Sequence, residues 1–314
     1  MMRVPSVFPF RRYGICAAIA LLLASNVQAV ESNSTAYPLG LDTVLAGRIP
    51  PPGFNAFLYS TAYKATEARD QDGHQQGGLD DFKLSYEAVA LCMYYVYSDF
   101  RFLGATVASR AAQTYIDGQV GWYANTPQGR VRYSGKDEGL GNLAFTPVFL
   151  GWDAPGLYQM VGLDLYAPTG GYDKEKLFNV GNNVWSFSPW YSFTAYPTDK
   201  LEVSAKFIYM INQRNSDTDY RSGREVNIDY HVAYDVSDNW QAGISGYAYK
   251  QVSDDEVHGV SVANNGNRGQ VFGFGPSVKF HNENMTLVLK WQHEALVENR
   301  AQGDRVWFQA VLPF

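Results

Sequence analysis

The fold is decided by the stretch Arg305-Val-Trp-Phe-Gln-Ala-Val-Leu-Pro-Phe314. Counted back from Phe314, every second residue is apolar, and the residues between them are more mixed. A period of two with one apolar face is typical of a β-strand that packs this face against apolar material. Outer-membrane β-barrels commonly end in such a strand, and the barrel-insertion machinery reads its terminal aromatic residue. We therefore expect that machinery to contact Phe314.

The first residues have the pattern of a secretory signal peptide. Three arginines precede the apolar run 15–24, and Val27-Gln28-Ala29 offers a cleavage site. The run is too short to span a bilayer as a helix. Residues 1–29 are therefore predicted to be removed by cleavage near Ala29 during export.

Removal of this peptide makes the chain more acidic. The full sequence has 25 basic and 31 acidic residues, and loss of three arginines takes the net charge from −6 to about −9. This charge argues against nucleic acid as a partner and suits an exported protein. Cys92 is the one cysteine left in the mature sequence, so no intramolecular disulfide is expected.

Short alternating segments recur along the mature chain. In 224–236, for example, Val226, Ile228 and Tyr230 share one face, and polar residues occupy the other. No second apolar run is long enough for a spanning helix, whereas about ten alternating residues suffice for a tilted strand. Twelve such segments can be followed, at 53–65, 83–97, 101–113, 140–152, 157–168, 184–196, 201–213, 224–236, 239–251, 270–281, 284–296 and 304–314.

The expected fold is all-β, a transmembrane antiparallel β-barrel of about twelve strands. Tight turns such as 153–156 and 197–200 alternate with longer connectors. The longer ones are predicted as loops at 66–82, 114–139, 169–183, 214–223, 252–269 and 297–303. This alternation predicts short periplasmic turns and longer extracellular loops. Aromatic residues, 15% of the sequence, are expected to form girdles at the two membrane interfaces.

Three stretches resemble a known family. They are Tyr37-Pro-Leu-Gly40 followed by Arg48-Ile-Pro-Pro-Pro-Gly53, then Ala167-Pro-Thr-Gly-Gly-Tyr172, then Gly181-Asn-Asn-Val-Trp-Ser-Phe-Ser-Pro189. In this order and at these distances they resemble the SphA-like family of outer-membrane proteins, whose members are described as transporters of the meta-pathway of phenol degradation. The resemblance covers nearly the whole mature chain and implies a barrel in the outer membrane of a Gram-negative bacterium. The family's links to aromatic catabolism and sphingoid lipids imply hydrophobic substrates, but no binding residues carry over.

Residues 30–52 precede the barrel, which is expected to occupy 53–314. Leu41, Val44 and Leu45 would share one face of a short helical turn. We interpret this segment as a small plug that folds into the lumen. A disordered periplasmic tail is the alternative interpretation.

With apolar faces turned toward lipid, the other faces line the lumen. Charges of both signs are expected to pair across it, because an unpaired charge in a confined lumen is costly. Glu87 is expected to share an inward face with Val89, Leu91, Met93 and Tyr95, an apolar patch that favours a hydrophobic or amphipathic solute. The predicted lumen path comprises Glu87, Leu91, Met93, Arg110, Asp164, Lys206, Asp229, His231 and Lys290, with His231 an ion-pair partner beside Asp229 and Lys206.

These observations predict an outer-membrane channel for passive uptake of small hydrophobic or amphipathic molecules, such as aromatic compounds or single-chain lipids. A non-conducting binding or structural barrel is the alternative, followed by a lipid-modifying enzyme. The enzyme would need a serine beside a histidine base, and the sequence has no His-x-Ser arrangement. We therefore predict no enzyme activity, metal or cofactor. The expected partners are outer-membrane lipid and lipopolysaccharide, the insertion machinery and a small hydrophobic ligand.

Overall fold

The computed structural model describes residues 35–262, 265–283 and 285–313. The predicted signal peptide, the first residues of the 30–52 segment and Phe314 lie outside the described residues. Among the described residues, no helix is long and apolar enough to cross a membrane.

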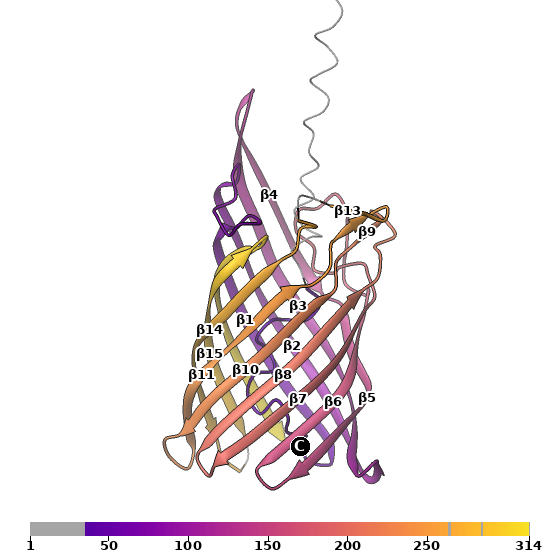
Figure 1. Ribbon diagram of the computed structural model, residues 1–314, viewed down its shortest axis with the longest axis vertical. Coiled ribbons are helices and arrows are strands. Elements are labelled where there is room, and N and C mark those ends of the chain that lie inside the picture. Colours follow the sequence, from indigo (N-terminus) through magenta and orange to yellow (C-terminus); the bar gives the residue numbers. More distant parts are fainter. Residues whose placement is uncertain (1–34, 263–264, 284, 314) are drawn as a thin grey trace, which may run out of the picture.

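One antiparallel sheet closes on itself to form a barrel (Figure 1). Closure joins the first strand to the last, since Asn55 pairs with Pro313 and Ala68 with Ala301. Twelve strands of the described chain lie around the circumference, which confirms the predicted fold. They are β1 (Gly53–Ala68), β2 (Asp80–Phe102), β3 (Ala105–Thr126), β5 (Leu143–Ala154), β6 (Leu157–Ala167), β7 (Ser186–Thr198), β8 (Leu201–Asn212), β10 (Glu225–Asp235), β11 (Trp240–Gln251), β14 (Gln270–His281), β15 (Thr286–Glu298) and β16 (Ala301–Pro313).

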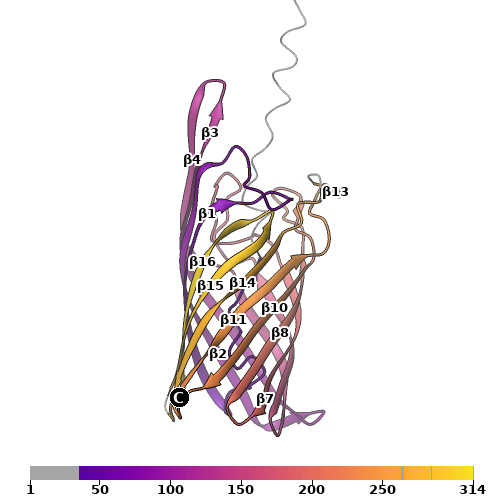
Figure 2. The ribbon, with the colours of Figure 1, turned by 60° about the vertical axis from the view of Figure 1, so that its left-hand side comes forward.

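A long hairpin projects from one end of the barrel, where a loop was predicted over 114–139 (Figure 2). β3 continues to Thr126, and β4 (Gly129–Leu140) pairs with its upper part. Nearer the barrel, β5 takes over the pairing with β3. The loop prediction was wrong because β4 is exposed along most of its length, so its backbone pairing has no apolar alternation to reveal it.

The connections differ between the two ends of the barrel (Figure 1). At the end where β16 finishes, the strands are joined by tight turns, at 103–104, 155–156, 199–200, 236–239 and 282–285. The other end, here called the loop end, carries the longer connections and a small sheet of β9 (Tyr220–Arg221), β12 (Glu256–Val257) and β13 (Val260–Ser261). One predicted loop, 297–303, is instead a tight turn at Asn299-Arg300.

The barrel is apolar outside, and its buried charged and polar side chains lie inside. Large apolar side chains such as Leu58, Phe207 and Ile244 are exposed on its outer face, whereas Lys206 and Asp229 are only 2% and 0% exposed. A soluble barrel would show the reverse pattern. Lipid suits this exterior, because a lysine or arginine on the lipid-facing side costs about 2–4 kcal/mol at the bilayer midplane.

Candidate functional site

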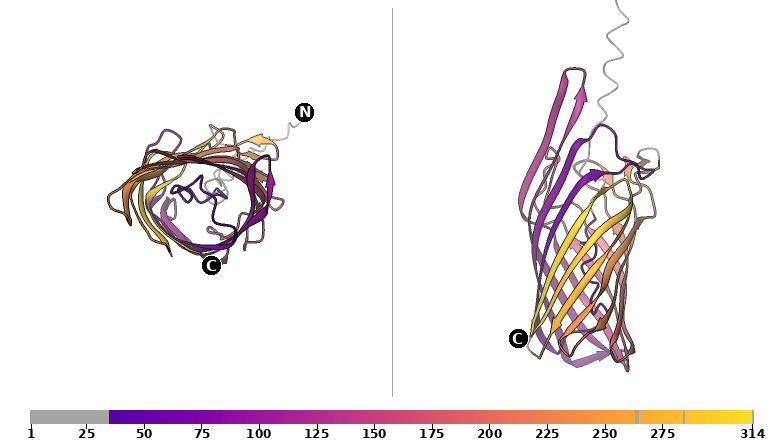
Figure 3. Two further views of the ribbon diagram at one scale, coloured as in Figure 1. Left: turned by 90° about the horizontal axis from the view of Figure 1, so that it is seen from below. Right: turned by 90° about the vertical axis from the view of Figure 1, so that its left-hand side faces the viewer.

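Residues 35–52, here called the lumen segment, run through the inside of the barrel (Figure 3). Tyr37, Leu39 and Thr43 are buried there. The segment passes from the loop-end half of the lumen to the short-turn end, where β1 begins at Gly53. Because it has no regular secondary structure, its backbone groups must find partners on the barrel wall.

Asp229 and Lys290 hold the upper part of the lumen segment. The Asp229 carboxylate accepts hydrogen bonds from Tyr37 Oη at 2.6 Å and from the Gly40 amide at 3.0 Å. The Lys290 ammonium donates to the carbonyls of Gly40 and Leu41, at 2.7 and 2.8 Å. The two wall residues therefore bind both the donors and the acceptors of one turn of the segment.

The lower part of the lumen segment is held through its amides. The Leu45 amide donates to Glu202 Oε1 at 2.9 Å, and the Gly47 amide donates to Thr194 Oγ1 at 3.0 Å. A Cβ atom on Gly47 would lie 2.4 Å from the Thr194 nitrogen. Only glycine therefore allows the segment to approach β7 this closely.

Asp42 joins the lumen segment to a buried charge network. Its carboxylate lies 2.7 Å from Lys206 Nζ and 3.5 Å from Arg110 Nη1. Arg110 also binds Asp164 through both carboxylate oxygens, at 2.8 and 2.9 Å, and Trp190 Nε1 donates to Asp164 at 2.8 Å. Two cations and two anions balance one another here, as a confined lumen requires.

A second polar cluster has the residue types of a serine-hydrolase triad. His231 Nδ1 lies 3.2 Å from Glu202 Oε1, and His231 Nε2 lies 2.9 Å from Ser277 Oγ. Lys279 Nζ also donates to Glu202, at 2.9 Å. Glu202, His231 and Ser277 are 0%, 1% and 3% exposed, and none of them lines the lumen cavity described below. In this conformation the serine is almost fully buried, whereas catalysis would require contact with a substrate.

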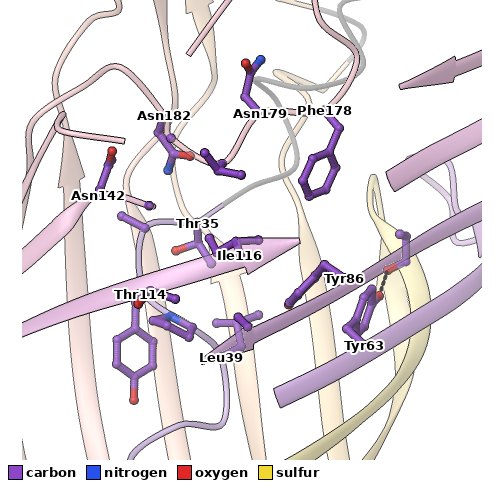
Figure 4. A pocket seen from close by; sticks show the side chains of 18 of the residues that line it. Thr35, Leu39, Tyr63, Tyr86, Thr114, Ile116, Asn142, Phe178, Asn179 and Asn182 are labelled. Carbon is purple, nitrogen blue, oxygen red and sulfur yellow. Dashed lines mark hydrogen bonds between the residues drawn. The ribbon is translucent and has the colours of Figure 1, made fainter. Parts of the chain in front are cut away.

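A cavity of about 900 Å³ lies between the lumen segment and the wall formed by β1 to β6 together with β15 and β16. Its size falls within the usual range for a small-molecule site. Figure 4 shows Tyr63, Tyr86, Ile116 and Phe178 among the side chains that line it. Apolar and aromatic groups dominate its walls, among them Leu39, Ala88, Ala90, Cys92, Val120, Trp122 and Val180.

Polar groups occur at several places on the cavity wall. Asp42, Arg110 and Asp164 line it on the side of the buried charge network. Asn142, Asn179 and Asn182 line it near the loop end (Figure 4). The cavity is therefore lined mainly by apolar and aromatic groups, with polar groups among them, which suits an amphipathic molecule.

The loop 168–185 lines this cavity. Phe178 packs so closely on β3 that a Cβ on Gly118 would lie 2.2 Å from its ring. At the base of the loop, the Gly181 amide donates to the Gly171 carbonyl at 2.9 Å, and a Cβ on Gly170 would lie 2.8 Å from Gly181 Cα. The glycines of the second and third motifs thus permit a close backbone crossing that positions Phe178.

The structure places six of the predicted path residues inside the barrel. These are Arg110, Asp164, Lys206, Asp229, His231 and Lys290. His231 lies on the same pair of strands as Asp229 and Lys206, but its hydrogen-bond partners are Glu202 and Ser277. Sequence reasoning missed Asp42, because its partners lie far away in the chain and nothing local distinguishes it from a solvated aspartate.

The inward placement of Glu87, Leu91 and Met93 was wrong. All three are exposed on the outer face of β2, as are Val89 and Tyr95. The inward row consists of Tyr86, Ala88, Ala90, Cys92 and Tyr94. Both rows of β2 are largely apolar, so alternation could not distinguish the lipid face from the lumen face.

Comparisons with known proteins agree with this geometry. The family described as "Putative MetA-pathway of phenol degradation" matches residues 65–310, most of the barrel. The chain belongs to this family. The match agrees with the resemblance found in the sequence motifs. None of the curated proteins matches the chain.

Two solved structures show the same architecture as this member of the phenol-degradation family. The COG4313 outer membrane channel from Pseudomonas putida F1 is 17% identical, with a TM-score of 0.70 over 85% of this chain and 97% of that one. The transport unit of the autotransporter AIDA-I from Escherichia coli is 9% identical, with a TM-score of 0.51 over 83% of this chain and 90% of that one. At these identities the likeness concerns the fold, which is that of an outer-membrane β-barrel.

Proposed function

We propose that this protein is an outer-membrane channel for the passive uptake of small hydrophobic or amphipathic molecules. The observation that carries the proposal is the apolar cavity inside the lumen, which an aqueous pore would not need. Membership of the phenol-degradation family supports aromatic compounds as one class of solute. Single-chain lipids have the same apolar character and are the second class.

The lumen segment acts in this proposal as a plug. Its contacts with Asp229, Lys290, Glu202 and Thr194 occupy the lumen beside the cavity. Export would follow cleavage near Ala29, with the loop end facing outward. The density of these contacts also favours a second candidate, a barrel that binds its ligand without conducting it.

A matched pair of substitutions on β2 tests the uptake function. Ala90 lines the cavity, whereas its neighbour Leu91 is exposed on the outer face. In proteoliposomes with a lipopolysaccharide outer leaflet, Ala90→Trp should lower the uptake of labelled phenylbutanol several-fold by filling the cavity. Leu91→Trp adds the same ring on the lipid side and should leave uptake unchanged.

The result also separates the two candidates. If the unsubstituted barrel binds phenylbutanol but does not speed its entry over protein-free vesicles, the non-conducting barrel is correct. If Ala90→Trp changes neither binding nor entry, the cavity is not the site.

A further inference from the structure

Two arginines on the cavity wall, Arg305 and Arg300, lack a carboxylate partner within 4.0 Å among the described residues, whereas three other lumen cations have one. Arg110 and Lys206 lie within 4.0 Å of Asp164 or Asp42, and Lys279 lies 2.9 Å from Glu202. Arg305 on β16 is 5% exposed and forms no such ion pair with any described residue. A buried charge without a counter-ion is costly, so its presence calls for an explanation.

The donors of Arg305 are only partly used. Its Nη1 donates to the Leu39 carbonyl at 2.6 Å and its Nη2 to Tyr86 Oη at 3.1 Å. Its Nε has no hydrogen-bond partner in the described part of the chain. A guanidinium carries five N–H donors, so Arg305 has donors beyond the two used in these bonds, and its side chain lines the cavity. Lys290 differs, because two carbonyls and Thr43 Oγ1 take its three donors.

The neighbouring acid does not neutralise Arg305 by direct contact. Both oxygens of Glu294 are taken, by Tyr247 Oη at 2.6 Å and by Tyr63 Oη at 2.7 Å together with the Gly303 amide at 2.9 Å. The same two tyrosine rings stack against the guanidinium, with their centroids 4.9 Å (Tyr63) and 5.5 Å (Tyr247) from Arg305 Cζ. The rings therefore fix the plane of the guanidinium, and the Glu294 oxygens are used by other donors.

A second arginine lies on the same cavity. Arg300, at the tight turn before β16, lines the cavity, forms no ion pair within 4.0 Å with a described residue, and stacks on Tyr249 at 4.6 Å. The cavity wall also includes apolar and aromatic groups such as Leu39 and Trp307, together with polar ones such as Glu294 and Asn299. The two arginines therefore adjoin a cavity whose walls are mainly apolar.

We infer that Arg305, supported by Arg300, binds the carboxylate of an amphipathic ligand whose apolar body occupies the cavity. The planar guanidinium matches the two oxygens of a carboxylate better than it matches a neutral hydroxyl. Aromatic walls such as Trp122 and Phe178 suit a ring or a chain on the other end of the ligand. This inference rests on the proposed function and narrows its substrate class to organic monocarboxylates.

The test compares two probes that differ only in the head group, phenylbutyrate and phenylbutanol. Binding to the full mature barrel in nanodiscs is measured by calorimetry at neutral pH, with empty nanodiscs as the blank. Since a hydrogen bond to a charged group contributes about 1.5–3 kcal/mol, the parent should prefer the carboxylate by about ten-fold or more. Arg305→Gln should remove this preference and leave phenylbutanol affinity unchanged.

Two further variants guard against indirect effects. Arg305→Lys keeps the charge and should retain part of the preference, whereas Arg132→Gln, on the exposed hairpin, should retain all of it. Heat-modified mobility on gels verifies that each barrel is folded. If the parent binds both probes equally, or Arg305→Gln keeps the preference, the inference is wrong. If the parent barrel binds neither probe, and neither probe enters proteoliposomes faster than protein-free vesicles, the proposed function is wrong as well.

Discussion

The Asp42 carboxylate lies 2.7 Å from the Lys206 ammonium, although the two residues are separated by 164 positions in the sequence. This contact links the lumen segment to the barrel wall at the buried charge network. Lys206 also lies 4.7 Å from the centroid of the Trp190 ring and 3.7 Å from Asp164, so its position is fixed from several sides. Any opening of the lumen through movement of the segment must break this contact.

Asp42→Asn should therefore loosen the lumen segment. The change leaves Lys206 and Arg110 facing one carboxylate in place of two, and loss of one partner from a buried pair costs about 3 kcal/mol. We expect single-channel recordings to show longer or more frequent open periods. Asp81→Asn is the matched control, because its ion pair with Arg130 is exposed and contributes at most about 1 kcal/mol. If the two variants show the same frequency and length of open periods, the contact between Asp42 and Lys206 does not hold the lumen segment.

Gly47→Ala tests whether the lumen segment must approach β7 closely in order to stay bound to the barrel wall. The added Cβ would meet the Thr194 backbone at 2.4 Å, and overpacking of this kind costs about 1–3 kcal/mol. We expect faster proteolysis of the lumen segment in the folded barrel and a rise in conductance. Gly77→Ala serves as the control, since nothing lies within 4 Å of the added atom. A segment as protected as in the parent would argue that the close approach is dispensable.

Leu91→Arg tests the orientation of β2. Because Leu91 is exposed on the outer face, the substitution places a charge in lipid, at a cost of about 2–4 kcal/mol near the bilayer centre. The midpoint for unfolding in guanidinium should fall accordingly in lipid vesicles. Arg132→Leu on the projecting hairpin, a change of the same two residue types outside the membrane, should have little effect. If Leu91→Arg is as stable as the parent, Leu91 does not face lipid, and the assigned orientation of β2 is wrong.

The sequence predicted where the strands lie, but it did not always predict which face of a strand points to lipid and which to the lumen. Val226, Ile228 and Tyr230 on β10 alternate with buried polar residues, so the strand and its facing could both be predicted. On β2 the inward Ala90, Cys92 and Tyr94 are as apolar as the outward row, and only the closed barrel distinguishes them. The twelve spans were predictable because lipid imposes a pattern on each strand, whereas the hairpin beyond the membrane is under no such constraint.

The charge network illustrates the same limit in the site. Arg110, Asp164 and Lys206 were expected in the lumen from their position on polar strand faces, and the structure brings them together. Their shared partner Asp42 belongs to a segment without periodicity, so no local pattern could assign it. Pairing across a lumen depends on closure of the barrel, which is a property of the whole chain.

Ser277→Ala provides the last test, of the triad-like cluster. His231 lies between Ser277 and Glu202 at hydrogen-bond distance, but catalysis would also need space beside the serine for a substrate. Ser277 is 3% exposed, and the Glu202 carboxylate that contacts His231 also accepts a hydrogen bond from Lys279 through its other oxygen. We therefore expect a fluorophosphonate probe to leave the folded barrel unlabelled, and Ser277→Ala to keep the parent's uptake of phenylbutanol. Labelling that disappears in Ser277→Ala would instead establish a hydrolase that opens when Leu45 leaves Glu202.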